Sequence, residues 1–175
     1  GRQPIPYRTP PGIERVQALS NNGVNLLLNE QALSLKALNL TDGSSRAVFK
    51  TMNLDMRQYG KLSMFIHAES IIGQSPLQDG QINAVIRIGQ DFLNNYYEIK
   101  IPLKITPFNT SDANLIWPAE NNLDFSLQEL VNLKLQRNSS GVPLNTIYRD
   151  TVGNHIYSVF GNPNLGEVRS FLIGI

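Results

Sequence analysis

Apolar and polar residues alternate with a period of two along several segments of this chain, and this pattern limits its fold more than any other feature. The clearest case is Tyr96–Thr106, where every second residue from Tyr97 to Ile105 is apolar. Leu62–Glu69 shows the same alternation, with Phe65 as the exception. Such alternation is typical of a β-strand with one buried and one exposed face. We therefore expect a sheet that buries one face.

Turn and breaker residues divide the chain into short strands. Asp42-Gly43 predicts a tight turn between two of them, and Leu33 and Leu35 are expected to point inward. Pro102 has no N–H to donate, so we expect the strand around it to lie at a sheet edge or to be bulged there. The predicted strands are Val24–Leu28, Ala32–Leu40, Ala47–Leu54, Leu62–Glu69, Ile82–Ile88, Tyr96–Thr106, His155–Phe160 and Glu167–Ile175.

One short helix is expected among these strands. Ser126 and Glu129 have the spacing of a capping box, and the apolar residues that follow predict a helix over Leu127–Gln136. Thr106–Glu120 and Val142–Asn154 are predicted to be loops. The chain is therefore predicted to be mainly β, an antiparallel β-sandwich of the jelly-roll, galactose-binding-like kind with one short helix. An immunoglobulin-like sandwich stays open as the alternative.

The length of 175 residues suits a single domain with a real core. We expect residues 1–12, which contain four prolines, to be a linker or edge segment, and residues 13–175 to form one β-sandwich domain. Both ends of the chain suggest a fragment of a larger protein. No apolar run approaches the roughly 20 residues that a membrane helix needs.

Composition excludes several functions. The net charge is +1, with 15 Lys and Arg spread thinly along the chain, so no large basic field is expected to hold nucleic acid. Cysteine is absent, which excludes disulfides, thiol catalysis and thiolate zinc sites.

No motif for catalysis is present. The only histidines, His67 and His155, lack the spacing of a metal site, and we expect both to be structural. No Gly-x-Ser-x-Gly sequence supports a nucleophilic serine. We expect a protein that is not an enzyme and that has no metal site and no cofactor, with a structural calcium ion in the loops as the one exception left open.

Aromatic residues are the remaining candidates for a binding site. Trp117, Tyr96 and Tyr59, together with Tyr97, could form a platform for a sugar or a partner, although packing in the core or at its rim is the more common role of such residues. A carbohydrate-binding module of a cell-surface protein is therefore the alternative function.

Two blocks of sequence resemble a known family. One begins at Asn29-Glu30-Gln31 and runs on through RAVFKTMNLDMRQYGKLSMFIHAE, and the other is the terminal FGNPNLGEVRSFLIGI. Together they are similar to the SprA/Sov family of gliding-motility and secretion proteins of Bacteroidetes. Pro10-Pro11-Gly12-Ile13 and ENNLDFSLQELVNLKLQRN also look similar to that family, whereas Val142–Asn154 matches it poorly.

The resemblance implies a role in type IX protein secretion. Members of the family are large outer-membrane proteins whose β-barrel forms the translocation channel, and they carry no catalytic residues. This chain would be a domain of such a protein that covers or gates the pore or docks partners. Its partners would be the rest of the parent barrel, other secretion proteins or secreted cargo.

The implied location is the cell envelope, at the cell surface, with the periplasmic side left open. We also considered a segment of the barrel itself, since barrel strands alternate too. The predicted helix, the long loops and the open edges that an excised barrel piece would expose favour a separate domain without a membrane span.

Overall fold

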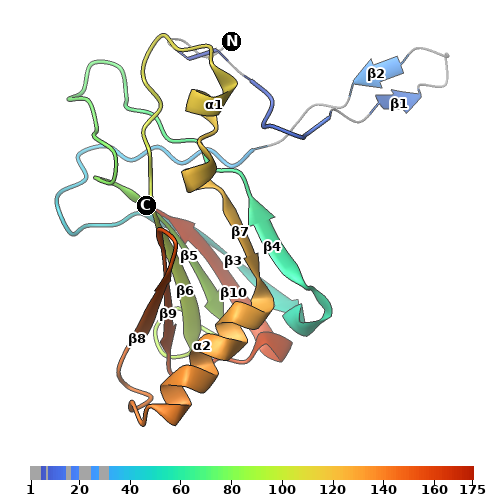
Figure 1. Ribbon diagram of the computed structural model, residues 1–175, viewed down its shortest axis with the longest axis vertical. Helices are drawn as coiled ribbons and strands as arrows, with labels where there is room; N and C mark the ends of the chain where they lie inside the picture. The colour runs from blue at the N-terminus through green and yellow to red at the C-terminus, as the bar shows by residue number, and fades with distance from the viewer. Residues whose placement is uncertain (1–4, 7, 15–16, 20–24, 28–31) are drawn as a thin grey trace.

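The computed structural model describes residues 5–6, 8–14, 17–19, 25–27 and 32–175. Its main layer is an antiparallel sheet of six strands in the order β3-β10-β5-β6-β9-β8 (Figure 1). These strands are β3 (Ala47–Leu54), β10 (Val168–Gly174), β5 (Asn83–Gly89), β6 (Tyr96–Pro102), β9 (His155–Phe160) and β8 (Tyr148–Val152).

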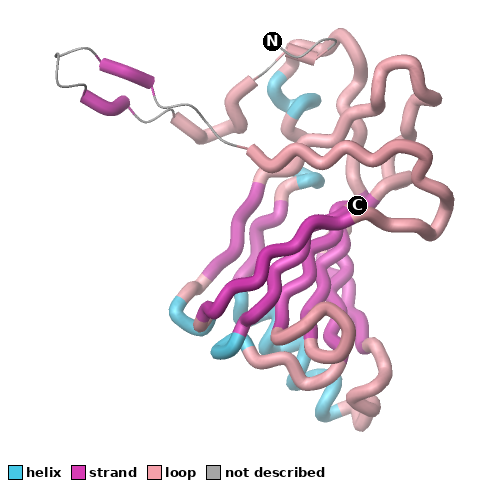
Figure 2. Tube along the Cα trace, turned by 180° about the vertical axis from the view of Figure 1, so that it is seen from behind, coloured by secondary structure: helices cyan, strands magenta, loops and turns pink. Residues whose placement is uncertain are grey.

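A second layer covers one face of this sheet. It consists of the antiparallel pair β4 (Lys61–Met64) and β7 (Leu123–Ser126), followed by the helix α2 (Leu127–Ser139). In Figure 1 this layer lies in front of the sheet, and in Figure 2 the same helix lies behind the strands. The opposite face of the sheet has no second layer among the described elements.

The core fills the space between the two layers because alternate residues of the central strands point into it. Ile86 and Ile99 face each other across β5 and β6 and are fully buried. Leu130 of α2 is also fully buried, and the ring of Phe125 in β7 lies 5.7 Å from the ring of Tyr157 in β9. At about 25 cal/mol per Å² of apolar surface, this burial between two layers is the main stabilising term.

Helix α2 begins as its sequence predicts. The hydroxyl of Ser126 accepts a hydrogen bond from the Gln128 N–H at 3.2 Å, which satisfies one of the free donors of the first turn. Leu127, Leu130 and Leu133 lie on its buried face. The helix runs to Ser139, three residues beyond the predicted end.

Shorter elements complete the fold. β1 (Gln17–Leu19) and β2 (Asn25–Leu27) form a separate antiparallel pair, and α1 (Ala113–Ile116) is a single turn. Three 3-10 turns are η1 (Met56–Gln58), η2 (Ala119–Asn121) and η3 (Leu165–Glu167).

The predicted fold class is confirmed: the chain is mainly β, with antiparallel sheets in a two-layer sandwich. The predicted strands at Ala47–Leu54, Leu62–Glu69, Ile82–Ile88, His155–Phe160 and Glu167–Ile175 correspond to β3, β4, β5, β9 and β10, although β4 ends at Met64. Of the predicted strand Val24–Leu28, residues 25–27 form β2, and residues 24 and 28 lie outside the described residues. The jelly-roll connectivity and the division of the chain at residue 12 stay predictions.

The predicted strand Ala32–Leu40 is wrong. These residues form a loop, and Leu33, expected to point inward, is 61% exposed while Leu35 is half-buried. The turn at Asp42-Gly43 is present, with a 2.9 Å bond from the Ser44 N–H to the Thr41 carbonyl, but only the strand after it exists. Alternation makes a strand only where a neighbouring strand accepts its hydrogen bonds, and this segment has none among the described residues.

Three further expectations are wrong for related reasons. Val142–Asn154 is not one loop, because β8 lies within it; its polar sequence suits an edge strand that is exposed on both faces. Thr106–Glu120 contains the helical turn α1. Tyr96–Thr106 is neither an edge strand nor bulged, because β6 is central; Pro102 is its last residue, and the pairing of β6 with β9 reaches only Lys100.

Candidate interaction surfaces

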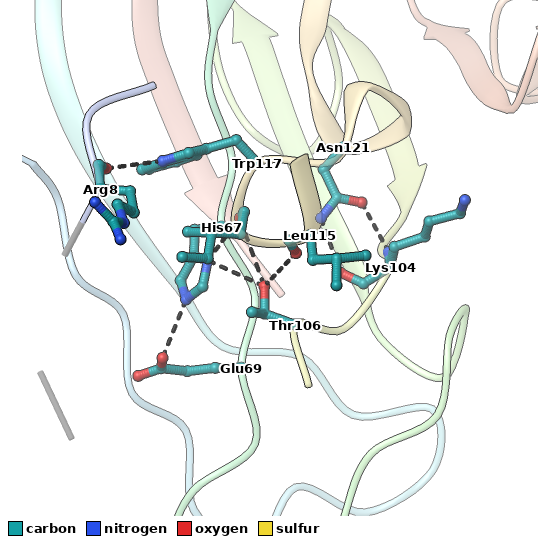
Figure 3. Close-up of polar contacts among 9 residues, drawn as sticks. Arg8, His67, Glu69, Lys104, Thr106, Leu115, Trp117 and Asn121 are labelled. Carbon is teal, nitrogen blue, oxygen red and sulfur yellow. Dashed lines mark hydrogen bonds and ion pairs between the residues drawn. The ribbon is translucent and has the colours of Figure 1, made fainter. Parts of the chain in front are cut away.

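The single tryptophan ties the proline-rich N-terminal segment to the body of the fold. Trp117 follows α1 and is half-buried, and its Nε1–H donates to the Arg8 carbonyl at 2.9 Å (Figure 3). The Arg8 Nε–H donates in turn to the Ser111 carbonyl at 3.2 Å. Ile5, in the same segment, is 1% exposed. We call Arg8, His67, Glu69, Thr106 and Trp117 the Trp117 cluster.

His67 is the centre of this cluster. Its Nδ1 lies 2.8 Å from the Ile116 carbonyl oxygen and its Nε2 lies 3.0 Å from Glu69 Oε2 (Figure 3). A carbonyl oxygen only accepts a hydrogen bond, so Nδ1 is the ring nitrogen that donates to Ile116. The ring also packs edge-to-face against Trp117 with centroids 5.6 Å apart. His67 therefore joins the segment that follows β4 to the α1 loop.

Thr106, His67 and Glu69 form a row that superficially resembles a catalytic triad. The Thr106 hydroxyl is 3.2 Å from His67 Nδ1, but it also donates toward the Leu115 carbonyl at 3.2 Å, and the residue is 2% exposed. A nucleophile must reach its substrate and be activated by a base with a free lone pair. Here the hydroxyl is buried and Nδ1 is occupied by a carbonyl, so the row holds segments together.

Asn121, which sequence reasoning missed, is another buried connector at this end of the sheet. It is fully buried, its Oδ1 accepts from the Lys104 N–H at 2.7 Å, and its Nδ2 donates to the Lys104 carbonyl at 2.8 Å (Figure 3). The side-chain amide thus takes the place of a neighbouring strand beyond the end of β6. An Asn in a polar loop gives no sequence signal for such a role.

A second polar cluster lies at the other end of the sheet, around the loop Gly161–Asn164. Arg137 of α2 is fully buried; its Nη1 donates to the Gly161 carbonyl, and its Nε and Nη2 donate to Asn138 Oδ1 at 3.2 and 3.0 Å. No carboxylate in the described ranges pairs with it. Burial of a charge is costly unless hydrogen bonds compensate, so these acceptors hold the guanidinium and the loop together.

Two more side chains fix the same loop. Lys134 Nζ donates to the Pro163 carbonyl at 2.8 Å, and the Tyr97 hydroxyl donates to the same oxygen at 3.5 Å. Burial raises the pKa of Tyr97 to about 12 and lowers the pKa of Lys134. Tyr97 therefore stays a neutral donor. The loop Gly161–Asn164, within the block FGNPNLGEVRSFLIGI singled out by its resemblance, is thus held by the side chains of Arg137, Lys134 and Tyr97.

The structure separates the predicted aromatic platform. Tyr96 is 6% exposed, with its ring 5.7 Å from that of Phe160 and beneath the Arg87 guanidinium at 4.0 Å. Trp117 lies beyond the opposite end of β6, a strand of about 20 Å. Tyr59 is 53% exposed and closes η1. Trp117 and Tyr96 therefore do not form a common surface, and a contact of any of the three residues with a ligand stays a prediction.

Strand β3 exposes apolar side chains at one edge of the sheet. The strand order of the six-stranded sheet places β3 at one edge, where it pairs with β10 alone. Phe49 is 65% exposed and Val48 is 43% exposed, and the Phe49 ring packs edge-to-face on Phe92 with centroids 5.0 Å apart. An exposed apolar edge strand is a site for pairing with another strand.

Other candidate binding sites have weaker support in the structure. A shallow, wide-open depression of about 450 Å³ lies beside Thr106 and is lined by Ser70, Asp79 and Phe108 among others. Within the described ranges, no three His, Asp or Glu residues come together as metal ligands. His155 is half-buried in β9, where burial lowers its pKa. A structural calcium ion stays a prediction. In the same ranges no helix is long and apolar enough to cross a membrane.

The fold and its surfaces together define a β-sandwich domain. Its polar clusters connect its own segments, and its β3 edge exposes apolar side chains. The family model described as "Motility related/secretion protein" matches residues 1–175, the whole chain. The chain therefore belongs to this SprA-type motility and secretion family, as its two sequence blocks suggested. No curated protein matches it.

Proposed function

We propose that this chain is a non-catalytic domain of an outer-membrane translocon for type IX protein secretion and gliding motility in Bacteroidetes. In that role it covers or gates the pore or docks partners at the cell surface. The family match over residues 1–175 carries this proposal. Its partners would be the channel-forming remainder of the parent protein, other secretion proteins or secreted cargo.

The geometry supports a mechanical role. The Trp117 cluster and the buried Arg137 use their polar groups on carbonyls and side chains of the same chain. The row of Thr106, His67 and Glu69 has no accessible nucleophile, as its buried hydroxyl shows. What the domain offers to other molecules is mainly the β3 edge and the uncovered sheet face.

An in-frame deletion of these 175 residues from the full-length protein tests the proposal. Secretion into the medium and spreading of colonies are expected to fall, while the amount of parent protein in the envelope is unchanged. Normal secretion together with normal spreading, at a normal level of the parent, would contradict the proposed role.

A further inference from the structure

We propose that the free edge of β3 is a docking site for an extended, acid-bearing segment of a separate partner protein, which adds a seventh strand to the sheet. The inference deepens the proposed function, because it names the surface and the chemistry of the partner. The observations that carry it are the direction of the β3 backbone groups, the exposed side chains beside them and the charge of Lys50.

The hydrogen bonding of β3 shows which backbone groups are free. Arg46 and Ile175 exchange both backbone hydrogen bonds, each at 2.9 Å, just before β3 begins. In an antiparallel ladder the bonded pairs recur at every second residue, so Val48 and Lys50 bond toward β10. The N–H and C=O groups of Ala47, Phe49 and Thr51 therefore point away from the sheet, and no described residue bonds them.

The two edges of the sheet differ in how they are protected. β8, the other edge, has five residues, and charged Arg149 and Asp150 stand in it. β3 has eight residues, the sequence AVFKTMNL and one charge. Long edges with apolar side chains invite strand addition, whereas short and charged edges resist it. The β3 edge is thus the one that is built to accept a strand.

Lys50 decides which occupant fits. It shares the core-side face of the sheet with Val48, because the register places them level with Ile88 and Ile86. Lys50 is exposed and makes no ion pair with any described residue. An Asp or Glu facing it on an added strand would form a favourable cross-strand pair.

A second copy of the chain fits less well. Two β3 strands that pair about Phe49 would place Lys50 of one copy opposite Val48 of the other, and the two Lys50 side chains would lie at diagonal positions on one face. Diagonal side chains in a sheet still interact, and like charges there repel. An apolar strand without an acid would leave the ammonium group beside apolar neighbours. A partner strand with a carboxylate resolves both conflicts.

The experiment uses the full-length protein in cells, with a photo-crosslinking side chain at position 49 and a control at position 151 on the β8 edge. We expect a crosslink from position 49, absent from position 151, to a separate protein at an extended segment that contains Asp or Glu. Lys50→Glu should lower its yield by about fivefold or more, and changing the partner's acid to Lys in that strain should restore it. Lys50→Gln is the matched variant with an intermediate loss.

A second pair of variants tests the backbone. Phe49→Pro removes an outward N–H without touching the ladder to β10, and Phe49→Thr removes the same ring but keeps the donor. Both variants should have a melting temperature close to that of the unmodified protein. Secretion should be lost in the Pro variant and largely kept in the Thr variant.

The outcomes separate the two proposals. A crosslink to a second copy, to the parent's own chain or to nothing overturns the docking proposal, as does a yield that Lys50→Glu leaves unchanged. If deletion of the domain stops secretion but the Phe49 and Lys50 variants do not, the proposed function stands and the docking site falls. If deletion has no effect, the proposed function falls, while the crosslink and its charge swap still report on docking.

Discussion

Single residues decide how closely the loops at the α2 end of the sheet can approach. Gly161 has φ +69°, and a Cβ there would lie 1.7 Å from the Asn94 carbonyl oxygen. Asn95 Oδ1 accepts from the Asn162 N–H at 2.9 Å, so the two loops are also bonded. Glycine is thus required at position 161 for two reasons: its positive φ, and the lack of space for a side chain.

Gly161→Ala is therefore expected to be among the most damaging substitutions in the chain. The overlap with the Asn94 backbone should cost about 4 kcal/mol or prevent folding. Gly153→Ala is the control, since Gly153 has φ +64° and a Cβ added there would have no neighbouring atom within 4 Å, and it should cost about 1 kcal/mol. Urea unfolding of both variants measures the difference, and equal losses would show that backbone conformation alone matters.

The contribution of Asp91 to the stability of the protein is expected to depend on pH. Burial opposes its ionisation, but hydrogen bonds from the backbone N–H groups of Asn94, Leu93 and Asn95 outweigh this and hold its pKa below the usual value. A lowered pKa in the folded state stabilises the protein above the pKa of the unfolded chain, about 3.9. This contribution is lost as the pH falls through the folded value.

Asp91→Asn should consequently flatten the loss of stability between about pH 5 and pH 2. Urea unfolding at a series of pH values measures the slope for both proteins. The variant should also be less stable at pH 7, because a neutral amide oxygen is a weaker acceptor than a carboxylate. Parallel slopes for the two proteins would show that Asp91 does not contribute to the acid sensitivity.

At the scale of elements, the strands that the sequence predicts well are those that bury one face against the second layer. β5, with Ala84, Ile86 and Ile88 inward, is such a case. The elements that were predicted wrongly are those that depend on a neighbouring strand. Ala32–Leu40 has the alternating pattern of a strand but no described strand pairs with it, whereas β8 pairs with β9 but lacks the alternating pattern. The short β7 was missed because four residues before a helix give almost no periodic signal.

At the scale of the whole molecule, the Trp117 cluster connects parts of the chain that are distant in sequence. Arg8, His67 and Trp117 are joined by hydrogen bonds and ring contacts across more than 100 residues. In Figure 1 the described part of the N-terminal segment, residues 5–6 and 8–14, passes near α1, at the end of the sheet away from α2. The cluster therefore attaches the proline-rich segment to the sandwich without being part of its core.

His67→Ala should loosen this attachment while the sandwich stays folded. The loss of the bonds to Ile116 and Glu69 and of the ring contact should cost about 1–3 kcal/mol, concentrated at the α1 loop. The emission of Trp117, the only tryptophan, should shift to the red, and the segment around Arg8 should be cleaved faster by protease. His155→Ala, at the other histidine, is the control for a general loss of stability. Emission and cleavage identical to those of the unmodified protein would show that His67 is not part of the attachment.

The sequence alone determined the fold class, the start of α2 and most strands, because alternation and capping are local consequences of which side chains avoid water. It also determined the family, because long blocks of ordinary residues in a fixed order are specific. Only the tertiary structure decided the partners of Asn121 and Arg137, the separation of Trp117 from Tyr96, and the free edge of β3. Those features depend on which segments become neighbours in the fold. The contacts that stabilise each pair of segments form between residues that are distant in sequence, so no local pattern predicts them.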